Sequence, residues 1–431
     1  MRILLVEPYA HTVSHAPQYA RDVGLALANA GAQVSLLTFD RMIGSKGLTK
    51  SIECHAVVNH VGVLRPLLRI LSRLLHFTLV LPAPDSFLTI LFAARWQRRQ
   101  RYDVIHILDD ALPTLSPFVL GILVRNCAIV TTLHNPYRER NLLQGWTGKL
   151  WRAFRGRDWA MAYRLLLARL QEGSPMATFR GFLYKRTTRR NNLAFVCLSE
   201  DERESYDQAF LYDRIVCVPE AKPASSPLAR QEARQTLGLS QDDTVVLSFG
   251  VNHDWKNYQV IFQAAQALRG RFKLLFGGRI LPKDSKGNDP RRLAKQYGWA
   301  TDTVVADKYI PDEEIPLYFC AADALLLSYR KEFAGRSGGL RYASRYGVPV
   351  IASDGGPLGE AVRRHNLGLT FAPDDPASLK EALVSFLGLE QEERDRTKDN
   401  LLAFSYSPEQ MAKSYLSLYQ GLLPVEVVSN G

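Results

Sequence analysis

The chain has 431 residues, of which 46% are hydrophobic and 23% are charged, and this composition is that of a globular protein. Its length exceeds that of one ordinary domain, so two or three domains are expected. The five cysteines stand singly with no C-x-x-C spacing, which argues against a metal site or a disulfide framework and favours a reducing compartment.

The net charge of +11 comes mostly from one stretch of the first half. Between Lys149 and Arg190, eleven basic residues are opposed only by Asp158 and Glu172. Such a patch favours an anionic partner, either nucleic acid or acidic lipid. Because no nucleic-acid-binding motif accompanies the charge, we favour an anionic membrane surface and expect no nucleic acid.

In chain order, the first half alternates short apolar runs with helical patterns. Ile3–Glu7 reads as a strand, Gln18–Ala30 as a helix and Gln33–Phe39 as the next strand. Further strands are predicted at 104–108, 128–133, 194–198 and 215–218. This alternation predicts a parallel sheet in which each strand ends in polar residues. The opening residues lack the pattern of a signal peptide, so we expect a cytoplasmic protein, bound at most to the inner face of a membrane.

Two insertions interrupt this rhythm, at 63–99 and 145–191. Both mix Arg with Leu, Phe and Trp at helical spacing, as interfacial amphipathic segments do. The alternative is that their apolar faces pack on the core, which we expect for part of Asp85–Arg95. For the second insertion we favour membrane contact.

A Pro- and Ser-containing stretch, Pro219–Asp243, is interpreted as a linker. The alternation then resumes, with strands at 245–249, 273–276 and 303–305, a helix at 258–268 and closing helices at 376–387, 391–404 and 407–422. The sequence therefore predicts an α/β protein with domains at 1–220 and 221–405. The remaining residues, 406–431, form a helix and tail that return to the first domain. We expect a substrate site between the two domains.

The stretch Leu325–Asp354 carries the clearest sign of a binding site. It reads as strand, polar loop, helix and strand, with Ser337 as helix cap and Gly338 and Gly339 in the first turn. Helix N-termini bind anions, and Arg336 adds a forked donor for phosphate. The alternative is an ordinary strand-to-helix turn.

These patterns together resemble a GT-B glycosyltransferase of family 4, in its Ser-Gly loop variant. The segment from Gly250 to Lys256 is similar to the strand end that holds the donor diphosphate, although Val251 stands where the family has Arg. Tyr309–Tyr318 is similar to the turn that receives the nucleobase, at Ile310. The resemblance implies two Rossmann-like domains, a nucleoside-diphosphate sugar, a retaining reaction and no metal or other cofactor.

The resemblance also assigns site residues. The donor diphosphate would be held by Lys256, Arg336, Ser337, Gly338 and Gly339, and the nucleotide by Gly250, Asn252, His253 and Ile310. His134, in Thr132-Leu133-His134-Asn135, lies where the family has a His near the sugar. On the acceptor side, His11 and His15 are candidates, with a plain polar loop as the alternative.

One feature of the family is missing from this chain. The acidic pair that contacts the sugar would fall at Ala334 and Tyr342, neither of which is acidic, and Glu332 could replace only the first. The resemblance as a whole still implies a glycosyltransferase, and we expect it to act on a glycan or lipid-linked acceptor in polysaccharide or glycolipid synthesis. The alternatives are a non-catalytic GT-B protein that binds a nucleotide or partner, and a sugar-nucleotide epimerase-like enzyme.

Overall fold

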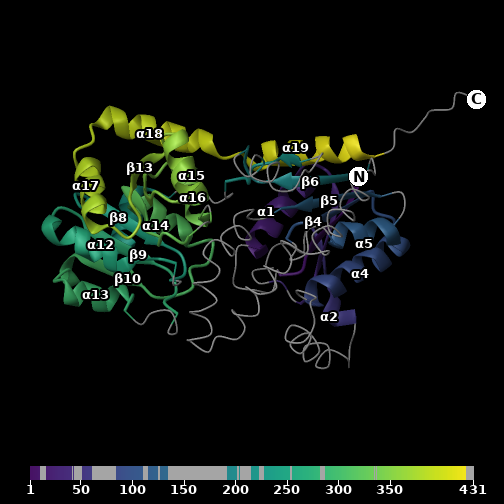
Figure 1. Ribbon diagram of the computed structural model, residues 1–431, viewed down its shortest axis with the longest axis horizontal. Coiled ribbons are helices and arrows are strands. Elements are labelled where there is room, and N and C mark those ends of the chain that lie inside the picture. The colour runs from purple at the N-terminus through teal and green to yellow at the C-terminus, as the bar shows by residue number, and fades with distance from the viewer. Residues whose placement is uncertain are drawn as a thin grey trace, which may run out of the picture. The chain divides into compact units, whose positions relative to one another are not determined.

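The computed structural model describes residues 1–9, 16–40, 42, 51–60, 84–109, 115–124, 127–133, 192–200, 203, 215–222, 228–252, 255–281, 287–333, 335 and 337–423. The chain divides into two units, the first made of 1–221 with 407–431 and the second of 222–406. Both are α/β units built on an all-parallel sheet, as the alternation of strands and helices predicts (Figure 1).

The sheet of the first unit has seven strands in the order β3-β2-β1-β4-β5-β6-β7. The strands are β1 (Arg2–Glu7), β2 (Gln33–Thr38), β3 (Glu53–Ala56), β4 (Val104–Ile107), β5 (Ala128–Thr132), β6 (Leu193–Cys197) and β7 (Ile215–Cys217). The helices are α1 (Ala16–Asn29), α2 (Val57–His60), α4 (Pro84–Gln100), α5 (Leu115–Leu123) and α19 (Pro408–Leu422). Residues 407–422 therefore belong to the first unit, where α19 packs beside α1.

Helix α4 covers the C-terminal part of the first predicted insertion. Its Ile90, Ala93 and Ala94 are buried in one apolar cluster with strand residues of β1, β2 and β4. That part of the insertion packs on the core, as expected for part of Asp85–Arg95, because its apolar residues recur on one helical face. The rest of that insertion and the whole of 145–190 lie outside the described residues.

The sheet of the second unit has six strands in the order β10-β9-β8-β11-β12-β13. They are β8 (Val245–Phe249), β9 (Lys273–Gly277), β10 (Thr303–Ala306), β11 (Ala324–Leu327), β12 (Val350–Ser353) and β13 (Gly368–Phe371). The helices are α11 (Arg230–Thr236), α12 (Tyr258–Ala265), α13 (Pro290–Gln296), α14 (Ile315–Ala321), α15 (Gly338–Tyr346), α16 (Gly356–Arg364), α17 (Pro376–Leu387) and α18 (Gln391–Phe404). Two short 3-10 helices, η3 (Gln266–Leu268) and η4 (Ala300–Asp302), complete it.

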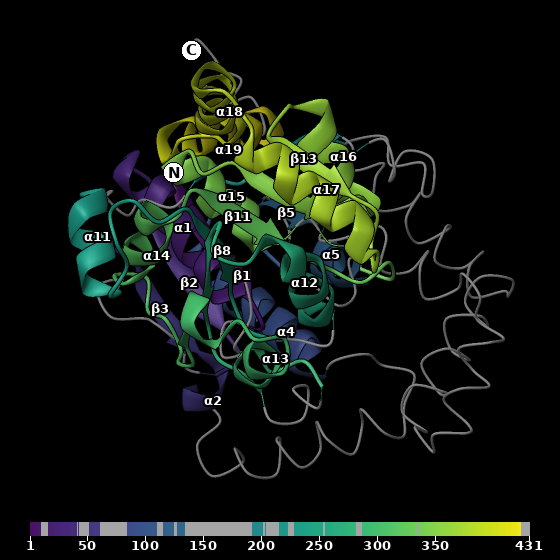
Figure 2. The ribbon, with the colours of Figure 1, turned by 90° about the vertical axis from the view of Figure 1, so that its left-hand side faces the viewer.

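Helices cover both faces of this second sheet, which explains why its strands are apolar throughout. Residues of α11, α14, α15 and α16 form one buried cluster with alternate strand residues such as Leu247 and Leu325. Residues of α12, α13 and α17 form another with Val246 and Leu326 on the opposite face (Figure 2).

The linker interpretation of Pro219–Asp243 is wrong for its second half. Residues 230–236 form α11, which packs on α14, and Ala233 and Arg234 are fully buried. The polar and charged composition of this segment is typical of an exposed linker. It is compatible with a buried helix here because the guanidinium of Arg234 is hydrogen-bonded inside the unit. None of the helices in the described part of the chain has the length and apolar character that crossing a membrane requires.

Candidate donor site at the edge of the second sheet

The strand order of the second unit reverses between β8 and β11, and the predicted diphosphate residues follow these two strands. In doubly wound sheets, ligands bind outside the carboxyl ends of the strands at such a point. There the segment after β8 and the segment after β11 pair directly, through an isolated bridge between Lys256 and Tyr329. The N–H group of Arg330 also donates to the carbonyl of Trp255 at 2.9 Å. The structure thus brings two separately predicted segments together.

Lys256 is 6% exposed, and its ammonium group lies against the end of β8. Its Nζ donates to the carbonyl oxygens of Phe249, at 2.6 Å, and Gly250, at 3.2 Å. Burial lowers the pKa of Lys256 to about 7, because the charged form loses its hydration. An anion bound next to Nζ would stabilise the charged form of this lysine, which burial otherwise disfavours.

Two buried asparagines hold the Lys256 backbone in place. Asn288 donates through Nδ2 to the carbonyl of Lys256 at 2.8 Å and accepts from the N–H of Tyr258 at 2.7 Å. Asn252 in turn donates to the carbonyl of Asn288 at 3.0 Å. The side chain of Asn252, a predicted nucleotide contact, is 1% exposed and is used inside the unit.

The start of α15 supplies the other side of the site. Ser337 has a φ of 65°, and its Oγ accepts from the N–H of Gly339 at 3.3 Å, so it caps the helix as predicted. The same oxygen is hydrogen-bonded to the hydroxyl of Tyr329 at 2.9 Å. A side chain at Gly339 would place its Cβ 3.1 Å from Leu327, so this helix start lies close against β11. The N–H groups of Gly339 and Leu340 already bond to Ser337, so it is the N–H of Gly338, together with the helix dipole, that favours an anion here.

The base-binding turn predicted at Ile310 lies next to β9 and β8. The Ile310 side chain is buried and packs against Gly277 at the end of β9, so closely that a Cβ added at Gly277 would lie 3.1 Å from it. Gly278, with a φ of 141°, is required because a Cβ there would lie 2.3 Å from the carbonyl oxygen of Gly250. Within the described residues, the main-chain N–H and carbonyl of Ile310 form no hydrogen bond. Gly250 itself turns the chain after β8 with a φ of 98°.

The position predicted for the second acidic residue is occupied by Tyr342, which packs among aromatic side chains. Tyr342, on α15, is 8% exposed, and its ring lies 6.0 Å from that of Phe249 and 5.4 Å from that of Phe319. The other expected position, Ala334, lies outside the described residues. Glu332 is exposed, in a turn closed by a hydrogen bond from the N–H of Phe333 to the carbonyl of Arg330.

Five predicted site residues lie outside the described part of the chain: His11, His15, His134, His253 and Arg336. Among the residues that are described, no three His, Cys, Asp or Glu side chains cluster as a metal site requires.

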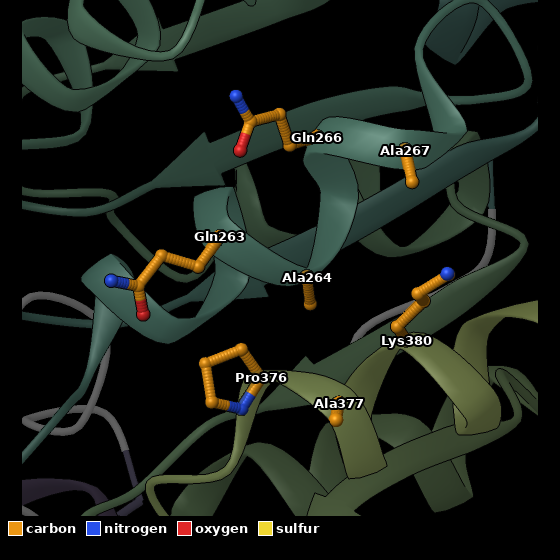
Figure 3. Close-up of a pocket in the computed structure, with 7 residues that line it drawn as sticks. All are labelled: Gln263, Ala264, Gln266, Ala267, Pro376, Ala377 and Lys380. Atoms are coloured by element: carbon orange, nitrogen blue, oxygen red, sulfur yellow. The ribbon is translucent and has the colours of Figure 1, made fainter.

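A hollow of about 320 Å³ elsewhere on the second unit contains none of the predicted residues. It lies between α12 with η3 and α17, and alanine side chains line it with Lys380 at its edge (Figure 3). These residues belong to helices that cover one face of the sheet.

Comparison with known proteins links the segment that holds this site to a known family. Residues 229–401 match the model of a family described as glycosyl transferases group 1. A D-inositol 3-phosphate glycosyltransferase of Acidothermus cellulolyticus is 30% identical over 188 residues, which are 41% of this chain and 41% of that protein. The chain thus spans less than half of that curated relative.

Solved structures match over nearly the whole chain. Sucrose-phosphate synthase of Thermosynechococcus elongatus is similar with a TM-score of 0.66 and 20% identity, covering 98% of this chain and 99% of that one. HepE of Anabaena, in complex with UDP and glucose, has a TM-score of 0.64 and 14% identity, with coverage of 97% and 99%. The prediction of a GT-B fold is confirmed, and within that fold residues 229–401 of the second unit match the glycosyltransferase group 1 model, which supports the enzyme class that the sequence predicts.

Proposed function

We propose that this chain transfers a sugar from a nucleoside-diphosphate sugar to a hydroxyl group of an acceptor. The observation that carries the proposal is that a main-chain bridge between Lys256 and Tyr329 joins, at the switch point of the second sheet, the segment with the buried Lys256 ammonium and the segment that leads to the glycine-rich start of α15. Both features favour a diphosphate, and they lie inside the segment that matches the glycosyltransferase group 1 model. The nucleobase would bind the unpaired main-chain groups of Ile310.

The proposed chemistry rests on electrostatic stabilisation of the leaving group. As the glycosidic bond breaks, negative charge develops on the β-phosphate of the donor. Lys256, Arg336 and the N–H groups of Ser337–Gly339 would stabilise that charge, which is usually a leading catalytic contribution. His134 would hydrogen-bond the sugar, and no metal or other cofactor is required. The reaction would retain the anomeric configuration, with the departing phosphate accepting the proton of the acceptor hydroxyl on the same face, as in family 4.

The acceptor is proposed from the basic stretch between Lys149 and Arg190. A lipid-linked sugar or glycolipid acceptor at the cytoplasmic face of a membrane fits a segment rich in Arg and Trp. Sedimentation with liposomes tests this part: binding to vesicles with anionic lipid, and release at high salt, are expected. Equal recovery in the supernatant with neutral and anionic vesicles would contradict it.

A second candidate function is nucleotide binding without catalysis, which Tyr342 favours. It occupies a position where family members have an acidic residue that contacts the sugar, and its ring is packed among aromatic side chains. This candidate would be supported if the chain binds a nucleoside diphosphate but does not cleave a nucleotide sugar in the presence of any acceptor tested.

A screen of nucleoside diphosphates and nucleotide sugars by thermal shift tests the donor site. A bound ligand at 100 times its Kd stabilises a protein by about 2.7 kcal/mol, which raises the melting temperature measurably. We expect a shift with at least one nucleotide in the wild type and a much smaller one in Lys256→Met, which keeps the buried volume but lacks the ammonium group. Lys380→Met, which removes an exposed lysine of α17, is the control and should respond as the wild type does. No shift with any nucleotide in the wild type would overturn the proposal.

A further inference from the structure

One carboxylate joins three loops at the edge of the second sheet. Asp374, in the connection between β13 and α17, accepts through Oδ1 from Nδ2 of Asn257 at 2.7 Å. Its other oxygen, Oδ2, accepts from the N–H of Lys331 at 3.2 Å. Asn257 follows β8 and Lys331 follows β11, so Asp374 bridges the two segments that supply the proposed donor site.

The first contact lies next to the proposed phosphate lysine. Asn257 is the residue after Lys256, and its side chain also caps α12 by accepting from the N–H of Val260 at 3.3 Å. Its main chain is paired with Ser328, whose carbonyl accepts from the N–H of Asn257 at 3.0 Å. Any shift of Asn257 therefore moves the Lys256 backbone with it.

The second contact fixes the loop that leads to α15. Two residues before Lys331, Tyr329 is held by Ser353, whose Oγ accepts from the Tyr329 N–H and donates to its carbonyl, both at 2.8 Å. The Tyr329 hydroxyl then reaches Ser337 at 2.9 Å. The Tyr329 ring is stacked on that of Phe333 with 3.9 Å between centroids, so the segment from Tyr329 to Phe333 turns back on itself.

The backbone of Asp374 indicates that this carboxylate has a specific place. Asp374 has a φ of 60°, in the left-handed region that few residues other than glycine, asparagine and aspartate adopt. Glycine would take this conformation without cost, so the side chain at 374 is not required by the turn itself. What the aspartate adds over glycine is its two accepted hydrogen bonds.

We propose that Asp374 is a positioning residue of the donor site, which clasps the β8–α12 and β11–α15 connections so that Lys256 and the start of α15 face the same anion. This inference rests on the proposed function, because it assumes that a nucleoside diphosphate binds there. Asp374 itself does not touch the ligand: its two oxygens are used by Asn257 and Lys331.

The sign of its charge makes the role testable. A carboxylate close to an anion site weakens anion binding through Coulomb repulsion, so Asp374→Asn should tighten binding if charge alone matters. If the clasp matters, the same variant should weaken binding. Asparagine keeps the left-handed backbone but offers only one acceptor oxygen, and its NH₂ group would face a donor. The two explanations therefore predict opposite changes.

The experiment measures the Kd of UDP by calorimetry for the wild type, Asp374→Asn, Asp374→Gly and Asp375→Asn. The last is the matched control: Asp375 caps α17, accepting from the N–H of Ala377 at 2.9 Å, and asparagine caps a helix equally well. It removes the same charge one residue away without touching the clasp. We expect roughly threefold to tenfold weaker binding for Asp374→Asn, at least about tenfold for Asp374→Gly, and no weakening for Asp375→Asn.

Amide hydrogen exchange provides a readout that needs no ligand. In Asp374→Gly the N–H of Lys331 loses its acceptor, so its exchange should accelerate about tenfold or more, while amides of the β11 strand keep their rates. Unchanged exchange at Lys331, or UDP binding in Asp374→Asn as tight as in the wild type, would overturn the clasp. If the wild type binds no nucleotide at all, the proposed function falls, and hydrogen exchange alone then decides whether the clasp exists.

Discussion

At the scale of single residues, the lowered pKa of Lys256 leads us to expect that donor binding depends on pH. Its pKa of about 7 in the free protein means that above this pH the ammonium is lost before a ligand arrives. A bound diphosphate favours the charged form, so binding above pH 7 must take up a proton. We expect the affinity for a nucleoside diphosphate to fall by up to about tenfold per unit between pH 7.5 and 9, where the ligand's own second ionisation, near pH 6, is complete. Calorimetry at these pH values, in buffers of different ionisation enthalpy, measures the affinity and the proton uptake together.

Two variants separate this effect from general alkaline weakening. Lys256→Met should bind weakly with a flat pH profile, and Lys380→Met should retain the wild-type slope. The pH dependence of the free energy of unfolding of the ligand-free protein is an independent test. The unfolded lysine holds its proton to about pH 10.4, whereas the folded one releases it near 7, so the unfolded state binds more protons in between. The free energy of unfolding should therefore rise with pH across this window relative to Lys256→Met. A wild-type affinity that stays constant from pH 7.5 to 9 would contradict the assignment.

At the scale of elements, one buried guanidinium attaches α11 to the second unit. Arg234 is fully buried, and its Nε donates to the carbonyl of Ala321 at 3.1 Å, at the end of α14. Its Nη2 donates to Oδ2 of Asp323 at 2.8 Å, and the same oxygen accepts from the N–H of Val245, the first residue of β8, at 2.7 Å. The charge is thus satisfied at the point where three elements meet.

Removing this group should destabilise the second unit strongly. Removing one fully buried partner of an ion pair costs about 3–5 kcal/mol, because the buried carbonyls and the partly buried Asp323 carboxylate lose their donor. We expect a loss of this order for Arg234→Met in urea unfolding. Arg230→Met is the control, since Arg230 also pairs with Asp323 but its side chain is 49% exposed, and such pairs contribute about 0–1 kcal/mol. Equal losses for both variants would show that burial does not decide the strength of this contact.

The helices and strands near the site could be predicted because their signals are local. Ser337 caps α15, as the sequence predicts, and α17 and α18 have the predicted bounds. β3 and β13 were not predicted, since four-residue strands with mixed polarity carry little periodicity. Arg234 misled the prediction because its partners lie near the start of β8 and the end of α14, and the sequence does not show that they are close.

The residues that support the site were missed for the same reason. Asn288 contacts Asn252 and Lys256 from more than thirty residues away, and Asp374 lies still further from Asn257. No motif spacing marks such contacts, whereas Lys256, Ser337 and Gly339 stand in patterns that a short stretch of sequence can show. Asp374 stands directly before Asp375, the N-cap of α17, and no local pattern distinguishes the two aspartates.

At the scale of the whole molecule, the last helix belongs to the first unit although it follows the second in sequence. Tyr415 of α19 is hydrogen-bonded to Tyr19 of α1, oxygen to oxygen, at 2.7 Å. Tyr419 is hydrogen-bonded to Nδ1 of His106 at 2.7 Å, and Nε2 of His106 to Thr132 at 2.8 Å. All five side chains are at most 1% exposed, so α19 completes a polar network between α1, β4 and β5. A buried polar group that loses its partner costs free energy, so the network depends on the two tyrosines of α19.

A chain that ends at Tyr406 should therefore lose the fold of the first unit and keep that of the second. Burial of one large apolar side chain is worth about 1.5–3 kcal/mol, and α19 buries Met411, Tyr415, Tyr419 and Leu422, so their loss approaches the 5–15 kcal/mol that stabilises a typical domain. The second unit keeps the bond from the N–H of Lys222 to the carbonyl of Tyr406. Limited proteolysis with mass spectrometry should show cleavage throughout 1–221 and protection of 228–406. A chain that ends at Leu423 retains α19 and is the control. If the chain that ends at Tyr406 protects its first unit as well as this control does, α19 is dispensable and the network with His106 contributes little.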